Sequence, residues 1–187
     1  MSIPRTVFAY HGCDETAAER LLFGEKFKHS ENSYDWLGSG IYFWEYGPNR
    51  ALRWAENQKR RGKIKNPAVV GAIIALDRCF DLLDTKFTAD LGSAFEVWRT
   101  ILEKQGAEPP ENTGPEKRLR RRDCAMINWY LGELERQGDG YATIRGAFLE
   151  GAPAFPGSEI LLESHIQITV RNPACIIGVF RPRMGES

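Results

Sequence analysis

The chain has 187 residues, and its 25 Lys and Arg are balanced by 25 Asp and Glu. This length suits a single domain with a substantial core, and zero formal net charge gives no global attraction to nucleic acid or an anionic membrane. The longest apolar run is too short to span a bilayer, and residues 1–5 carry no apolar signal region. The four cysteines are too scattered for a zinc-binding pattern. We expect no metal site, no membrane association and a cytoplasmic location, where thiols stay reduced.

The first part of the chain alternates short strands with helices. Asp14 suits the N-cap of the first helix, which Gly24 ends, and Pro48 suits the first position of the second. A β-branched apolar run indicates a fully buried third strand. The predicted elements are a strand at 7–10, a helix at 14–23, a strand at 40–43, a helix at 48–58 and a strand at 68–76.

Two helices and four strands are predicted in the rest of the chain. Apolar residues recur at helical spacing from Phe87 to Leu102, and a proline-rich loop then leads to a second amphipathic segment. The predicted helices are 88–104 and 116–137, and the predicted strands are 141–149, 160–162, 165–170 and 175–180. We therefore predict one α+β domain over residues 1–187, with a helical insertion at about 85–137.

Three motifs lie close together near the N-terminus. They are Tyr10-His11-Gly12, Gly38-Ser39-Gly40-Ile41-Tyr42-Phe43 and the helix Arg50-Ala51-Leu52-Arg53-Trp54-Ala55. In this order and spacing they resemble the first two motifs of the diphtheria-toxin and poly(ADP-ribose) polymerase branch of ADP-ribosyltransferases. The resemblance covers residues 7–56, extends to the C-terminal strands and is absent over roughly 80–140. It implies an ADP-ribosyltransferase-like fold of split antiparallel β-sheets with flanking helices and a helical insertion, with NAD as the substrate.

The resemblance also implies which residues bind NAD. Tyr42 would stack on the nicotinamide ring over a large rigid area. The backbone of Gly12 would approach the carboxamide because no Cβ intervenes, and His11 would hydrogen-bond a ribose. The implied NAD-binding set is His11, Gly12, Ser39, Tyr42 and Trp54, with Trp54 as a second stacking wall. Where the family often has a serine that binds the carboxamide, this chain has Asn49 or Arg50.

The glutamate that the family carries on a late strand has two candidate positions here. One alignment places Glu159 at the position of the family's glutamate, directly before residues 160–162. The other places Gln167 there, with His165 on the same face of the strand. We prefer the second because polar side chains on an otherwise apolar strand need a reason. The predicted catalytic residues are therefore His11, Tyr42, His165 and Gln167.

Glutamine is a departure from the family pattern. It cannot act as a general base or offset positive charge as a carboxylate would, although it can hold a ribose hydroxyl. The enzyme would then transfer a single ADP-ribose unit, use Glu163 or Glu159 as the negative charge that offsets the positive centre, or have low activity.

Structural interpretations compete with these functional ones. His11 and Tyr42 also suit a core, and His165 with Gln167 also suits the solvent face of an antiparallel strand. The basic segment 117–122 is typical of a solvated helix face, and its functional interpretation is contact with nucleic acid or an acidic partner.

The sequence thus favours an NAD-dependent mono-ADP-ribosyltransferase that modifies a protein or nucleic acid acceptor. A small domain of this kind would suit a toxin or defence effector with an antitoxin or immunity partner. Two alternatives stay open. One is a degenerate module that binds NAD, ADP-ribose or a partner without turnover. The other is an RNA 2′-phosphotransferase, which would need several basic residues around the NAD pocket.

Overall fold

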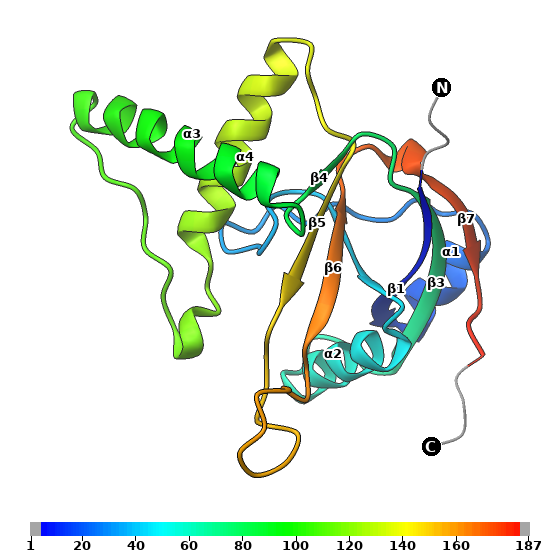
Figure 1. The fold of residues 1–187 in the computed structure, drawn as a ribbon. Coiled ribbons are helices and arrows are strands. Elements are labelled where there is room, and N and C mark those ends of the chain that lie inside the picture. The colour runs from blue at the N-terminus through cyan, green and yellow to red at the C-terminus, as the bar shows by residue number, and fades with distance from the viewer. Residues whose placement is uncertain (1–4, 184–187) are drawn as a thin grey trace.

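The computed structural model describes residues 5–183 (Figure 1). Residues 1–4, on which part of the expectation about a signal region rests, lie outside that range. The helices are α1 (Glu15–Leu22), α2 (Pro48–Arg60), α3 (Thr85–Lys104) and α4 (Arg121–Arg136), with short 3-10 turns at Pro115–Lys117 and Pro173–Cys175. The strands are β1 (Thr6–Asp14), β2 (Ile41–Glu45), β3 (Pro67–Ala75), β4 (Cys79–Asp81), β5 (Thr143–Phe148), β6 (His165–Val170) and β7 (Ile176–Phe180).

The strands form one mixed sheet in the order β4-β5-β6-β2-β1-β3-β7. Every neighbouring pair is antiparallel except β4 and β5, which are parallel. The α+β class is confirmed, but the strands form one sheet where we expected two. Its halves are joined weakly, because β1 and β2 pair only at Ala9↔Glu45 and Tyr10↔Trp44. We call this short ladder the seam.

The helices cover the two faces of the sheet unevenly. Helix α1 packs on the face to which Cys13 and Val70 point. Helix α2 packs on the opposite face, over Gly12, and α4 packs on that same face near Ile144 of β5. In Figure 1, α3 and α4 extend from the β4–β5 edge, and α2 crosses the lower part of the sheet. The strands between α2 and α4 are β2 and β6.

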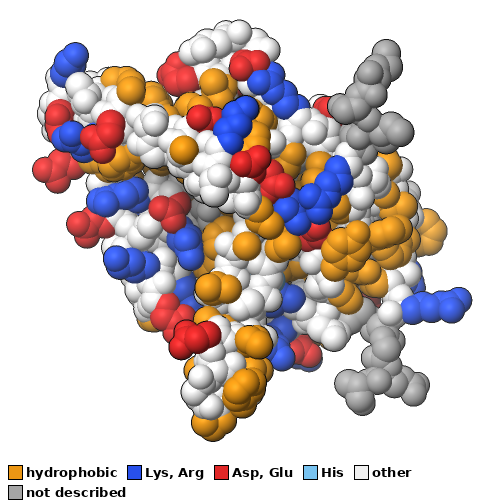
Figure 2. Space-filling view, in the orientation of Figure 1, with side chains coloured by type: hydrophobic (Ala, Val, Ile, Leu, Met, Phe, Trp, Pro, Cys, Tyr) orange, Lys and Arg blue, Asp and Glu red, His pale blue; other side chains and the backbone are white. Residues whose placement is uncertain are grey.

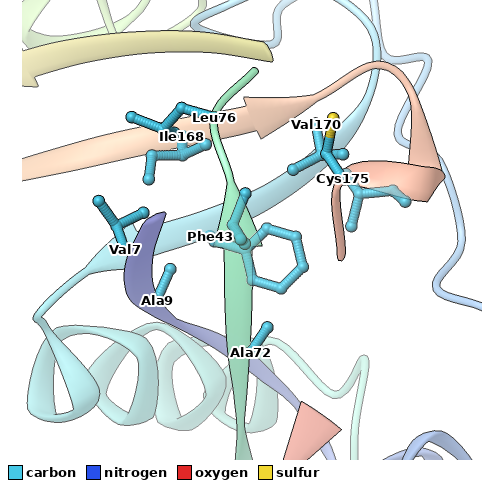
Figure 3. Close-up of a cluster of buried hydrophobic side chains, with 10 residues drawn as sticks. Val7, Ala9, Phe43, Ala72, Leu76, Ile168, Val170 and Cys175 are labelled. Atoms are coloured by element: carbon cyan, nitrogen blue, oxygen red, sulfur yellow. The ribbon is translucent and has the colours of Figure 1, made fainter. Parts of the chain in front are cut away.

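The central core lies on the face of the sheet opposite α2 and α4 (Figure 3). Phe43, Ile168 and Val170 meet Val7 and Ala9 there, and all five are almost fully buried. Because strand side chains alternate between faces, Tyr42 and Trp44 point the other way, toward the helices. This alternation decides where each candidate site residue lies.

Several predicted boundaries change, and one predicted strand is wrong. Residues 160–162 lie in a loop between β5 and β6, held by a single bridge between Pro153 and Leu161. Helix α4 begins at Arg121 instead of residue 116, because Glu116 and Lys117 have φ values of 51° and 53°, outside the helical region. The three-residue strand β4 was not predicted.

Exposed apolar side chains gather on the loop 149–164, which lies below the sheet in Figure 1 and is coloured largely as hydrophobic in Figure 2. Leu149, Phe155, Ile160 and Leu162 are all at least 60% exposed. Charges of both signs are interspersed over the helical part of the same view. Within residues 5–183, no helix combines the length and apolarity needed to cross a bilayer.

Gly12 has a packing role, which gives a testable prediction. A Cβ at this position would lie 2.3 Å from the Ala51 carbonyl oxygen of α2, a backbone atom that cannot move alone. We expect Gly12→Ala to lower the free energy of unfolding by about 1–3 kcal/mol through overpacking. Gly132→Ala is the control, because a Cβ there meets open space and should add up to about 1 kcal/mol of helix stability. Urea unfolding of both variants checks this, and equal stabilities would contradict it.

Candidate functional site

A row of polar side chains lines the face of β2 and β6 between α2 and α4. Trp44 pairs with Gln167 across the two strands, and His165 lies on the same face of β6. Trp44 Nε1, His165 Nε2 and Gln167 Oε1 are buried without a hydrogen-bond partner among residues 5–183. Each such atom costs about 1–3 kcal/mol if it stays unsatisfied. We call these three residues the polar row, and a ligand that reached these buried atoms would satisfy them.

A buried carboxylate adjoins the polar row. Glu150 is 8% exposed and accepts a 2.8 Å hydrogen bond from Arg50 Nη2. Its carboxylate oxygens also lie 3.6 Å from His165 Nδ1 and 3.6 Å from Arg118 Nε. Burial with this many partners makes Glu150 the best-held acidic group near the row. No sequence signal marks Glu150, because it follows β5 in a loop with no motif around it.

The site holds arginines and carboxylates in balanced number. Arg50 of α2 also lies 3.6 Å from Glu163, which lies 3.5 Å from Arg53. Arg50, Arg53 and Arg118 thus face Glu150 and Glu163, and Arg118 also pairs with Glu116 at 2.7 Å, so the charges balance. A phosphate can replace these carboxylates as the partner, because guanidinium groups bind phosphate oxygens with a matching geometry.

Aromatic rings surround the His165 imidazole. Trp36 stacks beside it with a 6.2 Å centroid distance and a 28° interplanar angle, and Phe148 lies 5.8 Å away. The Trp36 indole N–H donates to the Arg118 carbonyl oxygen at 2.9 Å, which fixes the ring. On the other side of the row, Trp44 lies 5.8 Å from Trp54 of α2. The site therefore offers flat apolar surfaces on both sides of its polar atoms.

The His165 ring is held in one tautomer. Its Nδ1 lies 2.7 Å from the Glu163 carbonyl oxygen, which can only accept, so Nδ1 carries the hydrogen and Nε2 is left as the acceptor. Burial lowers the pKa of His165, and the cation of Arg50 adds to that shift, against the carbonyl contact that opposes it. At neutral pH the imidazole is uncharged and Nε2 can take a proton.

His11 does not join the polar row. Its ring lies on the core face, 5.4 Å from Phe27 and 5.6 Å from Phe43, whereas Tyr42 and Gln167 face the helices. Its Nδ1 forms a 2.8 Å hydrogen bond with the backbone carbonyl oxygen of Tyr42 on the neighbouring strand β2. The expected pocket shared by these three side chains is therefore not formed, because neighbouring strand residues point to opposite faces. His11 instead bridges β1 and β2 just beyond the seam.

The hydroxyl of Tyr42 is engaged by the turn before β2. It donates to the Gly38 carbonyl oxygen at 2.6 Å and accepts from the Leu37 N–H at 2.8 Å, and burial raises its pKa. Ser39 is held by Asn128 of α4 through its N–H at 2.8 Å and its hydroxyl at 3.2 Å. Both residues position the loop that carries Trp36, and their predicted contact with NAD stays a prediction.

The two candidate positions for the late-strand glutamate of the family, Gln167 and Glu159, lie in different surroundings. Gln167 lies within β6 and is 9% exposed. Glu159 is exposed in the loop 149–164 and has no hydrogen bond or ion pair with any residue from 5 to 183. Glu163 lies at the site through its contacts with Arg50 and Arg53.

The basic segment 117–122 does not form one solvated face. Arg118 pairs with Glu116, and Arg121 donates to Thr113 at 2.7 Å. Arg120 lies 4.3 Å above the Trp36 ring, and Arg122 donates to the Pro110 carbonyl oxygen at 2.8 Å. The segment therefore ties the 105–120 loop to the site. Among the described residues, no three His, Cys, Asp or Glu side chains are placed to hold a metal ion.

Comparison with known proteins adds little to this geometry. No protein-family model matches the chain, and no solved structure matches it. The chain is 34% identical to "Uncharacterized protein MJ0359" of Methanocaldococcus jannaschii over an alignment that covers 39% of this chain and 36% of that protein. The match therefore spans about a third of that relative's length.

His11 makes the stability of the fold sensitive to mild acid. Burial lowers its pKa in the folded state, although the Tyr42 carbonyl contact opposes the shift. The unfolded chain then takes up a proton near pH 6.5 while the folded protein does not, so stability should fall as pH drops from 7 toward 5. We expect His11→Gln to flatten this dependence, measured by urea unfolding at several pH values. An unchanged slope in His11→Gln would contradict a role for His11. Burial also lowers the pKa of His165, so His165→Gln should flatten the dependence too, and each variant reports on its own histidine.

Proposed function

We propose that the protein is an NAD-dependent mono-ADP-ribosyltransferase whose reaction centre is the polar row together with Glu150. The observation that carries this proposal is the buried Glu150 carboxylate, 3.6 Å from His165 Nδ1, on the face where His165 Nε2 and Gln167 Oε1 have no partner among residues 5–183. The N-terminal motifs, which resemble those of ADP-ribosyltransferases, support the same reaction. His11 is not part of this reaction centre, because its ring lies on the core face.

The reaction is the cleavage of a glycosidic bond. The bond between C1′ of the ribose and the nicotinamide nitrogen breaks, and nicotinamide leaves with its electron pair as a neutral molecule. An oxygen or nitrogen of the acceptor then bonds to C1′ and loses its proton. The ribose becomes oxocarbenium-like, and a carboxylate stabilises such a centre. Glu150 supplies that charge in place of the missing strand glutamate, and His165 Nε2 is free to accept the proton.

The surroundings suit the other parts of NAD. Arg50, Arg53 and Arg118 supply donors for the diphosphate. Trp44 and Trp54 offer ring faces for nicotinamide, and Gln167 can hold a ribose hydroxyl. We place Trp54, rather than Tyr42, as the stacking partner, because Trp54 lies beside the row and Tyr42 packs against α4.

The test is to incubate the purified chain with NAD and measure free nicotinamide by chromatography. Biotin-tagged NAD added to a cell lysate then shows whether the label lands on protein or on nucleic acid, the acceptor that a toxin or defence effector would use. Nicotinamide release above the enzyme-free rate supports the proposal. NAD binding by calorimetry without release would favour the degenerate module instead, in which Arg50 neutralises Glu150.

An RNA 2′-phosphotransferase is a second candidate, because the structure gathers more basic residues than the sequence alone indicated. Arg50, Arg53, Arg118 and Arg120 all lie at the site. Such an enzyme needs these cations for the phosphates of both NAD and RNA. An oligonucleotide with an internal 2′-phosphate discriminates the two reactions. Loss of that phosphate in the presence of NAD would favour the phosphotransferase, and nicotinamide release without RNA would favour the transferase.

A further inference from the structure

A cavity of about 400 Å³ lies between α3, α4 and the turn before β2, beside the proposed reaction centre. Most of its lining is apolar, and its walls include Trp36, Leu91, Gly92, Phe95, Met126 and Phe148. Its volume falls within the range of small-molecule sites. Trp36 and Phe148 also contact His165, so the cavity and the reaction centre share a wall.

One cationic side chain in this cavity is arranged for a planar ligand. The Arg120 guanidinium carbon lies 4.3 Å from the Trp36 ring centroid and 5.1 Å from that of Phe148. Its Nη1 reaches Asp123 at 3.3 Å, but its Nε is buried and donates to no atom of residues 5–183. A wholly apolar occupant would leave that donor unsatisfied. A ligand that matches the cavity is therefore a flat ring with a hydrogen-bond acceptor on its edge.

We propose that this cavity binds a purine base. A purine has two flat faces for the apolar walls around Phe95 and Met126, since Arg120 and His165 already lie against Trp36. Its edge carries the N7 acceptor, joined by O6 in guanine, which arginine donors recognise. Asp123 offers an acceptor for the amino group of a base. Arg122, which also lines the cavity, adds positive charge for the phosphate that a nucleotide carries. The basic segment 117–122 thus gains a more specific role than the contact with nucleic acid or an acidic partner that its sequence indicated.

The site does not depend on NAD cleavage, because it is tested with nucleotides that contain no nicotinamide. AMP and GMP are titrated into the full chain and followed by calorimetry, with ribose 5-phosphate as the ligand that lacks a base. We expect both nucleotides to bind at least about tenfold more tightly than ribose 5-phosphate, because only the nucleotides carry a base that can stack. Equal affinity for ribose 5-phosphate would overturn the proposal.

Two variants locate the binding. Gly92 lies on α3 at the cavity wall, and a Cβ there meets nothing within 4 Å, so Gly92→Phe should fold and fill the space. We expect it to weaken AMP binding by about tenfold or more. Gly132→Phe is the matched control, a helical glycine with open space that does not line the cavity, and it should bind AMP normally. Unchanged AMP affinity in Gly92→Phe would overturn the proposal.

Arg120→Lys tests the same site without adding bulk, since lysine keeps the charge but loses the planar fork. It should weaken AMP and GMP more than ribose 5-phosphate, and an equal loss for all three would assign Arg120 to phosphate alone and overturn base recognition. Short single-stranded oligoadenylate, titrated in parallel, identifies the source of the base. Tighter binding than AMP points to a nucleic acid chain, and equal binding points to a free nucleotide; both outcomes retain the purine site.

Discussion

Glu150→Gln is expected to lower the rate of NAD cleavage by about a hundredfold or more, because it removes one preorganised charge from the reaction centre. The amide keeps the shape of the side chain and an oxygen that Arg50 can still reach. NAD binding should therefore fall much less than turnover, so the loss should appear in kcat rather than KM. Nicotinamide release at saturating NAD, together with calorimetric binding of NAD, measures the two effects separately.

Glu159→Gln is the matched control for this prediction. It makes the same chemical change in the exposed part of the loop 149–164, away from the polar row, and should leave the rate unchanged. If Glu150→Gln cleaves NAD as fast as the parent chain, the reaction centre lies elsewhere. Should that variant fail to fold, His165→Asn provides a second test of the reaction centre. Its amide can still donate to the Glu163 carbonyl, while the basic Nε2 is lost. Undiminished turnover in that variant would also contradict the proposal.

Arg145→Leu is expected to lower the free energy of unfolding by about 3–5 kcal/mol, which is the usual cost of breaking a buried ion pair from one side. Arg145 lies on the core face of β5 and is 5% exposed. Its Nε and Nη2 reach the two Glu45 oxygens at 2.5 and 3.1 Å, and its Nη1 reaches Asp81 at 3.1 Å. Without the guanidinium, the buried Glu45 carboxylate keeps only a distant contact with Arg5 at 3.6 Å.

Two comparisons separate the ion pair from a general effect of losing a long side chain. The double variant Arg145→Leu with Glu45→Leu should be more stable than Arg145→Leu alone, because no unpaired glutamate is left in the core. Arg99→Leu, which removes an exposed arginine of α3 from its helical ion pairs, should have little effect. Urea unfolding measures all three. An Arg145→Leu variant as stable as Arg99→Leu would show that the buried network contributes nothing.

The elements that the sequence predicted well are those with a strong local signal. The buried run at 68–76 became β3, and the helical spacing from Phe87 to Leu102 became α3, whose start moved to Thr85 because Asp84 caps it. Strand β4 could not be predicted in this way. It has only three residues, and it exists because it pairs with β5, which lies more than 60 residues further along the chain.

The candidate site was predictable only in part. The alternation of β6 pointed to His165 and Gln167, and the structure places both on the face between α2 and α4. Glu150, Trp36 and Arg118 come from three loops or turns that meet only in the folded chain, so no spacing rule links them. His11 was predicted to share a pocket with Tyr42 and Gln167, but its ring lies on the core face, and that direction depends on how β1 registers against its neighbours.

The Arg50–Glu150 ion pair connects the two halves of the sheet. Arg50 moves with α2, which packs on β1 and β3, whereas Glu150 extends from β5 on the other side of the two-pair ladder. The pair therefore links the two halves of the sheet across the seam, in addition to the core that Phe43 shares with Val7 and Ala9. Under the proposed function, a diphosphate that displaced Glu150 from Arg50 would break this link and free the carboxylate.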